Sequence, residues 1–262
     1  MSAESVPSPP PSPAPARGIR RRDVVVGLLG AASGVAAGHL ISQANALPPG
    51  AHTTYAQSGE DVVMYILARS LNTPQPSYLD IGAADPIQLS NTYFLYLAGG
   101  RGVLVEPNPA YGNQIRKVRP EDKLLPAGIG ISDATEADYY MFNGDGLNTF
   151  DPEQAQLVTK RPEIKLEKVI KMPLVNINRA ISENFGGNCP DIVSIDIEGL
   201  DLPVLKTLDF TKYRPKIVCA ETLITHSSKH NPETTPFMIS KGYEVRGMTF
   251  ANTIYVDSKI LQ

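Results

Sequence analysis

The stretch that decides the fold is residues 78–86, which read YLDIGAADP. Its first four residues predict a short, largely apolar strand, and Gly82 ends it. Because Gly82 has no Cβ, the backbone at this turn can approach a bound molecule closely. Asp80 places a carboxylate at the tip of the same strand. Apolar strands of this kind are typical of a parallel sheet that is covered on both faces.

Strands and helices alternate outward from this stretch through residues 51–262. Short apolar runs bounded by Gly or Pro predict strands, and apolar residues three or four apart predict helices. The predicted strands are 78–81, 102–106, 124–131, 191–196, 216–221, 243–248 and 253–257, with extra strands at 139–142 and 168–175. The predicted helices are 58–71, 91–98, 110–119, 177–185 and 202–208, one capped by Asp151 and one opened by Thr235. This alternation predicts a single α/β domain with a parallel, doubly wound sheet and right-handed crossovers.

Two of these helices carry charged residues whose positions can be predicted. Ser58 is the predicted N-cap of the first helix, and Glu60 and Asp61 fall in its first turn, where the positive helix end favours acids. The helix over residues 110–119 is predicted to expose a basic face to solvent, formed by Arg116, Lys117 and Arg119.

The composition excludes several classes of protein. Of the 262 residues 42% are hydrophobic, and 24 basic residues against 27 acidic ones give a net charge of −3. No nucleic-acid partner is expected, because binding driven by a basic surface needs a strongly positive domain. Two cysteines are too few for a disulfide framework or a Cys-rich zinc module. Cys189 and Cys219 are predicted to lie more than about 10 Å apart along neighbouring strands, so both are expected to be reduced and structural.

Residues 1–50 differ in composition from the predicted domain. Residues 2–17 consist mainly of Pro, Ser and Ala, which is typical of disordered or polyproline-like chain. Three arginines at 20–22 then precede an apolar stretch, residues 24–44, and small residues follow at 44–46. This pattern resembles a twin-arginine export signal. Two alternatives stand beside it: a membrane anchor, since residues 24–44 are long enough to span a bilayer, and a disordered cytosolic extension.

Acidic side chains are predicted at the tips of neighbouring strands, where ligands of such sheets bind. Glu106 ends the second strand, 26 residues after Asp80 (106 − 80). An acid in this position is suited to binding the two hydroxyls of a ribose. The turn lacks the G-x-G-x-x-G pattern of dinucleotide sites, which disfavours a nicotinamide oxidoreductase. A ligand with a ribose and a cation but no phosphate, such as S-adenosyl-L-methionine, fits better; the alternative is a glycine turn whose acids serve as caps.

The fourth strand is followed by two more carboxylates. Residues 194–199 read SIDIEG. In extended chain, Asp196 and Glu198 would point to one face, where one could orient a methyl donor and the other accept a proton from a substrate hydroxyl. Asp201, a little further on, is interpreted as a cap of the next helix.

Five blocks of this sequence, in this order and spacing, resemble the FkbM-type methyltransferases. They are Gln57–Asp61, Tyr78–Ala83, Ser90–Tyr93, Val105–Pro109 and Asp196–Asp201. The resemblance covers about residues 53–257. It implies a class I methyltransferase fold, which is Rossmann-like with seven strands, the last antiparallel. It also implies S-adenosyl-L-methionine as methyl donor and a hydroxyl acceptor on a sugar, a glycan or another natural product.

The resemblance also assigns candidate binding residues by their place in the blocks. Asp80, Gly82 and Ala83 match the loop at the methionine end of the donor, although Ala83-Ala84 stands where the family often has Asn-x-Gly. Glu106 matches the ribose acid. The remaining matches are Asn108 at the adenine edge, Ser132 and Asp133 on the adenine side, and Asp196 and Glu198 facing the transferred methyl group.

Methyl transfer from a sulfonium depends mainly on alignment of the reacting atoms, and a general base assists a neutral hydroxyl. Glu198 is the predicted base, Asp196 is expected to orient the donor, and His226 is the alternative base. No metal site is expected. His226 and His230 do form an H-x-x-x-H pattern, however, and Mg²⁺ held by Asp196, Glu198 and Glu221 stays open as an alternative.

The expected location is unresolved at the level of sequence. An export signal would place the protein outside the cytoplasm or at the membrane, with residues 24–44 as the tether, whereas the donor is made in the cytosol. A second function is therefore kept open: a non-catalytic, exported relative that binds a nucleoside-like ligand or a glycan.

Overall fold

The computed structural model describes residues 51–144, 147–224 and 228–261. The fold described below lies within the unit His52–Gln262. Across the described residues, no helix combines the length and the apolar character needed to cross a membrane. The predicted export signal or anchor lies outside the described residues.

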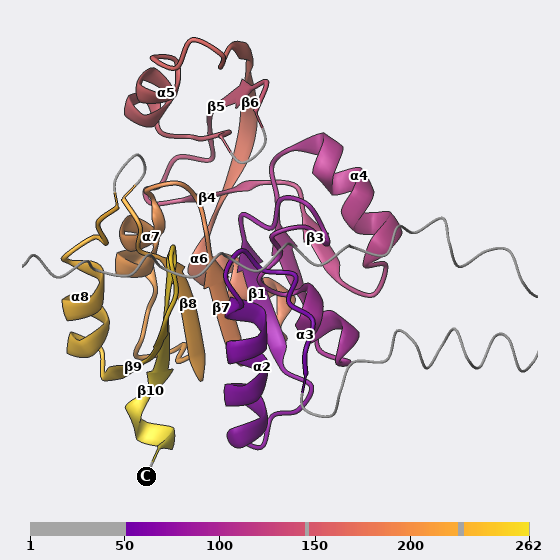
Figure 1. Ribbon diagram of the computed structural model, residues 1–262, viewed down its shortest axis with the longest axis vertical. Coiled ribbons are helices and arrows are strands. Elements are labelled where there is room, and N and C mark those ends of the chain that lie inside the picture. The colour runs from indigo at the N-terminus through magenta and orange to yellow at the C-terminus, as the bar shows by residue number, and fades with distance from the viewer. Residues whose placement is uncertain (1–50, 145–146, 225–227, 262) are drawn as a thin grey trace, which may run out of the picture. The chain divides into compact units, whose positions relative to one another are not determined.

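A seven-stranded sheet forms the centre of this unit (Figure 1). Its strand order is β3-β2-β1-β7-β8-β10-β9, and the antiparallel strand is β10, the last in the chain. The strands are β1 Ser77–Ile81, β2 Arg101–Val105, β3 Lys123–Leu125, β7 Ile192–Ile195, β8 Ile217–Glu221, β9 Tyr243–Met248 and β10 Asn252–Asp257. This is the predicted class I methyltransferase topology. The strand order reverses between β1 and β7, which is where a ligand site is expected.

Helices cover both faces of this sheet, as predicted for a doubly wound fold. They are α2 Glu60–Ser70, α3 Tyr93–Leu97, α4 Pro109–Val118, α6 Ile177–Asn184, α7 Asp201–Thr207 and α8 Thr234–Ser240, followed by the short helix η1 Ser258–Ile260. Successive strand residues point to opposite faces. Thus Tyr78 packs with α2 and α3, whereas Leu79 packs with α6 and α7.

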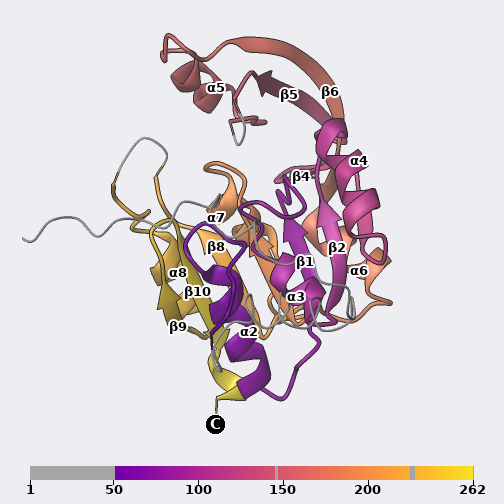
Figure 2. The same ribbon diagram turned by 45° about the vertical axis from the view of Figure 1, so that its right-hand side comes forward.

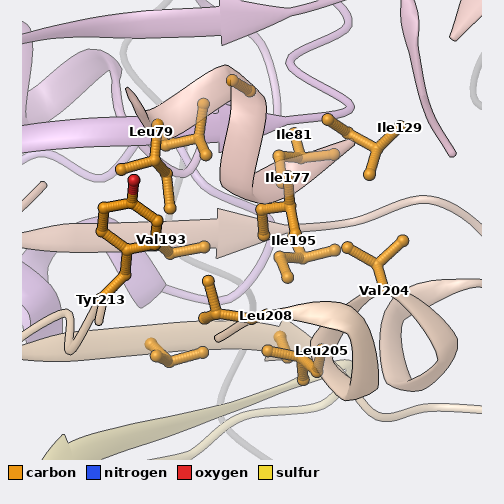
Figure 3. Close-up of a cluster of buried hydrophobic side chains, with 14 of the residues drawn as sticks. Leu79, Ile81, Ile129, Ile177, Val193, Ile195, Val204, Leu205, Leu208 and Tyr213 are labelled. Carbon is orange, nitrogen blue, oxygen red and sulfur yellow. The ribbon is translucent and has the colours of Figure 1, made fainter. Parts of the chain in front are cut away.

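The larger apolar core lies on the α6–α7 face (Figure 3). Leu79, Ile81, Val193 and Ile195 extend from β1 and β7 toward these helices and are buried from solvent. Burial of each such side chain stabilises the fold by about 1.5–3 kcal/mol. The core therefore fixes the two central strands whose tips begin the site.

A second sheet, of order β4-β6-β5, is inserted after β3. It consists of β4 Gly128–Gly130, β5 Glu136–Phe142 and β6 Leu166–Asn176, with α5 Pro152–Val158 between β5 and β6. The predicted extra strands are thus confirmed. Figure 2 shows β5, β6 and α5 projecting beyond the edge of the main sheet at which β1 and β2 end.

The predicted strand 124–131 is wrong, because it divides between the two sheets. β3 pairs with β2 as far as Leu125, and β4 then pairs with β6 from Gly128. Pro126 lies at the division, and proline has no N–H to continue a ladder. The main sheet therefore ends earlier here than the sequence pattern indicated.

The helix starts confirm most of the predicted caps. Asp151 accepts hydrogen bonds from the N–H groups of Glu153 and Gln154, and Asn176 accepts one from Asn178. Ser58, by contrast, is not the N-cap of α2: Gly59 takes that position with a φ of 92°. A left-handed residue is tolerated there because glycine has no Cβ. Both cysteines are free, as predicted.

Candidate active site

A pocket of about 620 Å³ lies at the carboxyl ends of β1, β2, β7 and β8. This volume is within the usual range for small-molecule and cofactor sites. Its described lining includes six carboxylates and no lysine, arginine or histidine. The carboxylates are Asp80, Asp85, Glu106, Asp196, Glu198 and Glu221.

The register of the sheet aligns the polar residues of this pocket in one row. Ile81 pairs with Val105 and with Ile195, and Ile195 pairs with Ala220. The next residue of each strand is therefore level with the others, which gives Glu106, Gly82, Asp196 and Glu221 in order across the sheet. Glu221 pairs in turn with Asn252 on β10. With about 4.8 Å between strands, the row is about 19 Å long.

The tip of β1 is held tightly against the tip of β7. The Asp196 N–H donates to the Ile81 carbonyl at 3.0 Å, and the Gly82 N–H donates to the Val105 carbonyl at 3.0 Å. Gly82 has a φ of 82°, and a Cβ there would lie 2.0 Å from the Asp196 carbonyl oxygen. Glycine is thus required at this position for both backbone conformation and space.

Asp80 is connected to a buried arginine through a threonine. The Thr92 hydroxyl donates to Asp80 Oδ2 at 2.5 Å, and Arg119 Nη2 donates to Thr92 Oγ1 at 2.9 Å. Arg119 also forms an ion pair with Asp122 at 2.8 Å. Burial raises the pKa of Asp80, while the Arg119 charge and the Thr92 hydrogen bond act to lower it.

Arg119 corrects the sequence analysis, which placed it on a solvated face. It is fully buried, and its Nη2 also donates to the Tyr78 hydroxyl at 3.1 Å. The helix α4 ends at Val118, so Arg119 has left the helical repeat and turns inward. Its burial gives a role to the block Ser90–Tyr93: Thr92 links the arginine to the site, and Ser90 Oγ lies 3.4 Å from Arg119 Nη1.

Glu106 occupies the tip of β2 and is 4% exposed. Its two carboxylate oxygens accept hydrogen bonds from the N–H groups of Ala84, at 2.8 Å, and Asn108, at 2.6 Å. Burial raises the pKa of Glu106 to about 7, against the lowering effect of these two hydrogen bonds. The carboxylate is thus oriented by the chain and retains further lone pairs for hydroxyl donors.

Asp196 and Glu198 both line the pocket, but not for the predicted reason. β7 ends at Ile195, and Glu198 has a φ of 54°, so the two residues are not in extended chain. A turn brings them to the same cavity instead. Burial raises the pKa of Asp196 to about 7, and the negative charges of Glu198, Asp80 and Glu60 add to the effect.

Asp201 is the first residue of α7 and follows its N-cap, Leu200. Its buried carboxylate accepts hydrogen bonds from the N–H groups of Asp201 itself and Gly199, while burial raises its pKa well above the usual value. The predicted role of Asp201 as the cap of this helix is therefore wrong: Leu200 takes the cap position, and the Asp201 side chain binds the turn that carries Glu198.

Two site residues were missed as ligand-binding groups by the sequence analysis. Glu221 had been considered only for a metal, and Asn252 had not been considered at all, yet both line the pocket. Asn252 Nδ2 donates to Glu60 Oε1, and the Thr249 hydroxyl donates to the same oxygen. The block Gln57–Asp61 is the signal that could have indicated this contact, since it contains Glu60 and a further lining residue, Gln57.

The inserted sheet supplies another wall of the pocket. Tyr139 on β5 and residues 147–150 of the loop before α5 line it. The rings of Tyr139 and Phe150 pack with centroids 4.7 Å apart. A Cβ at Gly128 would lie 2.4 Å from the Phe150 ring, so β4 passes directly beneath it. This wall is more apolar than the row of strand tips.

Three predicted residues are not brought into the pocket lining. Asn108 is the N-cap of α4 and accepts from the Ala110 N–H, and only its backbone N–H contributes, by orienting Glu106. Ser132 and Asp133 are exposed. Residues 127–129 line the pocket in their place, because the main-sheet strand ends before Pro126.

The histidine and metal alternatives have little support among the described residues. His226 lies outside them. His230 forms an isolated bridge with Leu223, and its Nδ1 lies 2.7 Å from the Thr222 hydroxyl. Within the described ranges, no three Asp, Glu, His or Cys side chains form a group that could hold a metal ion.

The strand order and the acidic row at the strand tips define a protein of the class I methyltransferase fold. The sequence profile described as the methyltransferase FkbM domain matches residues 80–245. The chain therefore belongs to the FkbM methyltransferase family, as the sequence resemblance implied, and S-adenosyl-L-methionine is the donor expected for this class.

Solved methyltransferase structures resemble the chain at low sequence identity, and no curated protein matches it. A TehB-like SAM-dependent methyltransferase from Corynebacterium glutamicum is 9% identical, with 85% of this chain and 95% of that chain covered and a TM-score of 0.41. The O-methyltransferase from Bacillus cereus in complex with SAH is 11% identical, with 87% and 91% covered and a TM-score of 0.37. Magnesium protoporphyrin IX methyltransferase from Synechocystis PCC 6803 with bound SAM is 10% identical, with 75% and 76% covered and a TM-score of 0.40.

Proposed function

We propose that the protein transfers a methyl group from S-adenosyl-L-methionine to a hydroxyl group of a sugar, a glycan or another natural product. The observation that supports this most strongly is the row at four adjacent strand tips in one pocket, in which three carboxylates, Glu106, Asp196 and Glu221, flank the Gly82 turn. S-adenosyl-L-methionine supplies an electrophilic methyl group on a positively charged sulfur. A lining with six carboxylates and no cationic side chain among its described residues is suited to such a ligand.

The order of the row suggests how the donor lies. Glu106 would accept hydrogen bonds from the ribose hydroxyls, because its carboxylate is fixed by Ala84 and Asn108. Residues 80–83 would hold the methionine end, where Gly82 allows close approach of the backbone. Asp196, one strand further, would face the sulfur. Asp80 is kept in place for this role by Thr92 and Arg119.

Glu198 is the proposed general base. The acceptor oxygen gains a bond to the methyl carbon as the carbon–sulfur bond breaks, and the hydroxyl proton passes to the Glu198 carboxylate. A base in this role would contribute about 10²–10⁴-fold to the rate, whereas alignment in the pocket contributes more. His226 is the alternative base. The methyl-transfer rates of two variants, one substituted at Glu198 and one at His226, distinguish the two candidates.

Binding of the product S-adenosyl-L-homocysteine to the full-length protein tests this function. Isothermal titration calorimetry should show saturable binding of this ligand and none of NAD, since the turn after β1 lacks the glycines of a dinucleotide site. Binding of NAD alone would refute the proposal. Binding of S-adenosyl-L-homocysteine without methyl transfer to any hydroxyl compound would favour the non-catalytic, nucleoside-binding relative.

We also propose that residues 20–46 act as an export or anchoring signal of the twin-arginine type. Fusion of residues 1–50 to a reporter protein tests this, with the double substitution Arg21→Lys and Arg22→Lys as control. A reporter that stays in the cytoplasm with or without the substitutions would refute the proposal. Such a result would agree with the synthesis of the donor in the cytosol.

A further inference from the structure

The far end of the acidic row, beyond the proposed position of the sulfur, carries two oxygen atoms without a hydrogen-bond donor. Asn252 is 1% exposed, lines the pocket, and has a buried Oδ1 without a partner. Its Nδ2 donates to Glu60 Oε1 at 3.2 Å, and this bond assigns Oδ1 to the opposite side of the amide. Glu221 Oε2 is likewise buried without a partner.

These two residues are direct neighbours in the sheet. Glu221 on β8 and Asn252 on β10 are paired in the antiparallel register, which places their Cβ atoms about 4.5–5.5 Å apart on one face. Asp196 is level with Glu221 on the adjacent strand, and therefore about 4.8 Å away. Both unpartnered atoms thus belong to one subsite, one to two strands beyond the residue that faces the sulfur.

The chemistry of this subsite favours a particular kind of group. Asn252 Oδ1 can only accept hydrogen bonds, and the ionised Glu221 carboxylate likewise only accepts; buried acceptors without donors are costly. An ammonium group offers three donors and no lone pair, whereas a hydroxyl offers one donor and turns its own lone pairs toward the carboxylates. An anionic group would meet Glu221, Asp196 and Glu198 together and be repelled.

The negative charge around Glu221 also favours a cationic group at this subsite. Glu221 lies among Asp196, Glu198 and Asp201, and burial with these neighbouring charges raises its pKa to about 10. The donor carries one sulfonium, one ammonium and one carboxylate, so its net charge of +1 leaves most of the six lining carboxylates without a counter-charge. With the subsite empty, the raised pKa keeps a proton on Glu221 near neutral pH, and a bound cation favours the ionised carboxylate, so that this proton is released.

We infer that the hydroxyl acceptor carries a protonated amine, which the Glu221 carboxylate and the Asn252 amide oxygen bind. This inference rests on the proposed function and narrows it to an amine-bearing substrate, such as an amino sugar. From the strand spacing, the amine lies about 5–10 Å from the hydroxyl that receives the methyl group. Acceptors that carry a phosphate or a carboxylate at this position are excluded.

A matched set of sugars tests the inference on the full-length protein. Binding of methyl glucosaminide, its N-acetyl derivative, methyl glucoside and methyl glucuronide is measured by calorimetry with S-adenosyl-L-homocysteine at saturation. The glucosaminide should bind at least tenfold more tightly than the N-acetyl derivative and the glucoside, and the glucuronide should bind most weakly. The absence of a preference for the amine, including the absence of any binding, overturns the inference.

Two substitutions locate the effect. Glu221→Gln keeps the shape of the side chain and removes its charge, so the preference for the amine should fall at least tenfold. Glu167→Gln, at an exposed site on β6 outside the pocket lining, should leave it unchanged. Each variant is first titrated with S-adenosyl-L-homocysteine alone.

This first titration separates the two levels of the proposal. A wild-type chain that fails to bind S-adenosyl-L-homocysteine refutes the proposed function. A chain that binds it and does not discriminate between the sugars refutes the amine subsite and leaves the function intact. If Glu221→Gln weakens S-adenosyl-L-homocysteine itself by tenfold or more, Glu221 belongs to the donor site, and the inference is likewise overturned.

Discussion

Replacement of Gly82 by alanine should open the site at its centre. The new Cβ would lie 2.0 Å from the Asp196 carbonyl oxygen, whereas real Cβ contacts are essentially never shorter than 3.0 Å. The tips of β1 and β7 must therefore separate by about 1 Å (3.0 − 2.0), which as overpacking costs about 1–3 kcal/mol. The left-handed φ of 82° adds about 1–2 kcal/mol for a residue with a Cβ.

The sum is a loss of about 2–5 kcal/mol in the free energy of unfolding, measured by urea denaturation. Gly186→Ala is the matched control, because Gly186 also has a positive φ, 61°, but a Cβ there meets no atom within 4 Å. It should cost only about 1–2 kcal/mol. Gly82→Ala should also weaken S-adenosyl-L-homocysteine binding at least tenfold, and Gly186→Ala should not. Equal losses of stability with full affinity in both variants would refute the close contact between the two tips.

Three further substitutions test other parts of the site. Arg119→Met should lower the free energy of unfolding by about 3–5 kcal/mol, because the buried Asp122 carboxylate loses its counter-charge; a loss below 1 kcal/mol in urea denaturation would contradict this. Glu106→Gln should alter the pH dependence of stability. The folded pKa of about 7 lies above the usual 4.5, so this carboxyl favours the folded state most below pH 4.5, and its contribution falls by about 3 kcal/mol as the pH rises to 7. Wild type should lose that much more stability than the variant over this range, and parallel curves would count against it. Phe150→Ala should raise the Kd of S-adenosyl-L-homocysteine, because the Phe150 ring lies over Gly128 in the part of the wall that replaces the predicted adenine-side residues, whereas an unchanged Kd with a raised KM for the acceptor would place Phe150 at the acceptor.

The central sheet could be predicted because its strands are locally encoded. Tyr78–Ile81 and residues 192–195 are short apolar runs that end in Gly or acidic residues, and Asp151 and Asn176 cap the helices that the sequence assigns to them. The carboxylates at these ends follow from the same pattern, since parallel strands bring their carboxyl ends to one edge.

What could not be predicted depends on contacts between distant parts of the chain. Arg119 was placed on a surface because its charge is all that the sequence shows, and its burial depends on Asp122, Thr92 and Tyr78 together. Glu60 and Asn252 are 192 residues apart, and their hydrogen bond exists only once α2 lies on the sheet.

The division of the predicted third strand could have been recognised from the sequence, because a proline interrupts its otherwise apolar residues. Pro126 interrupts residues 124–131, and the pocket is accordingly lined by residues 127–129 and not by Ser132 and Asp133. The position of the inserted sheet beside the pocket has no comparable signal, because it depends on the pairing of β4 with β6.

A crystal structure of the full-length protein with S-adenosyl-L-homocysteine tests the central claim most directly. The ribose hydroxyls should lie within hydrogen-bond distance of the Glu106 carboxylate, and the sulfur should lie beside Asp196 at the adjoining tips of β1 and β7. A ligand bound elsewhere, or one whose ribose faces away from Glu106, would contradict the assignment of this row of carboxylates to the methyl donor.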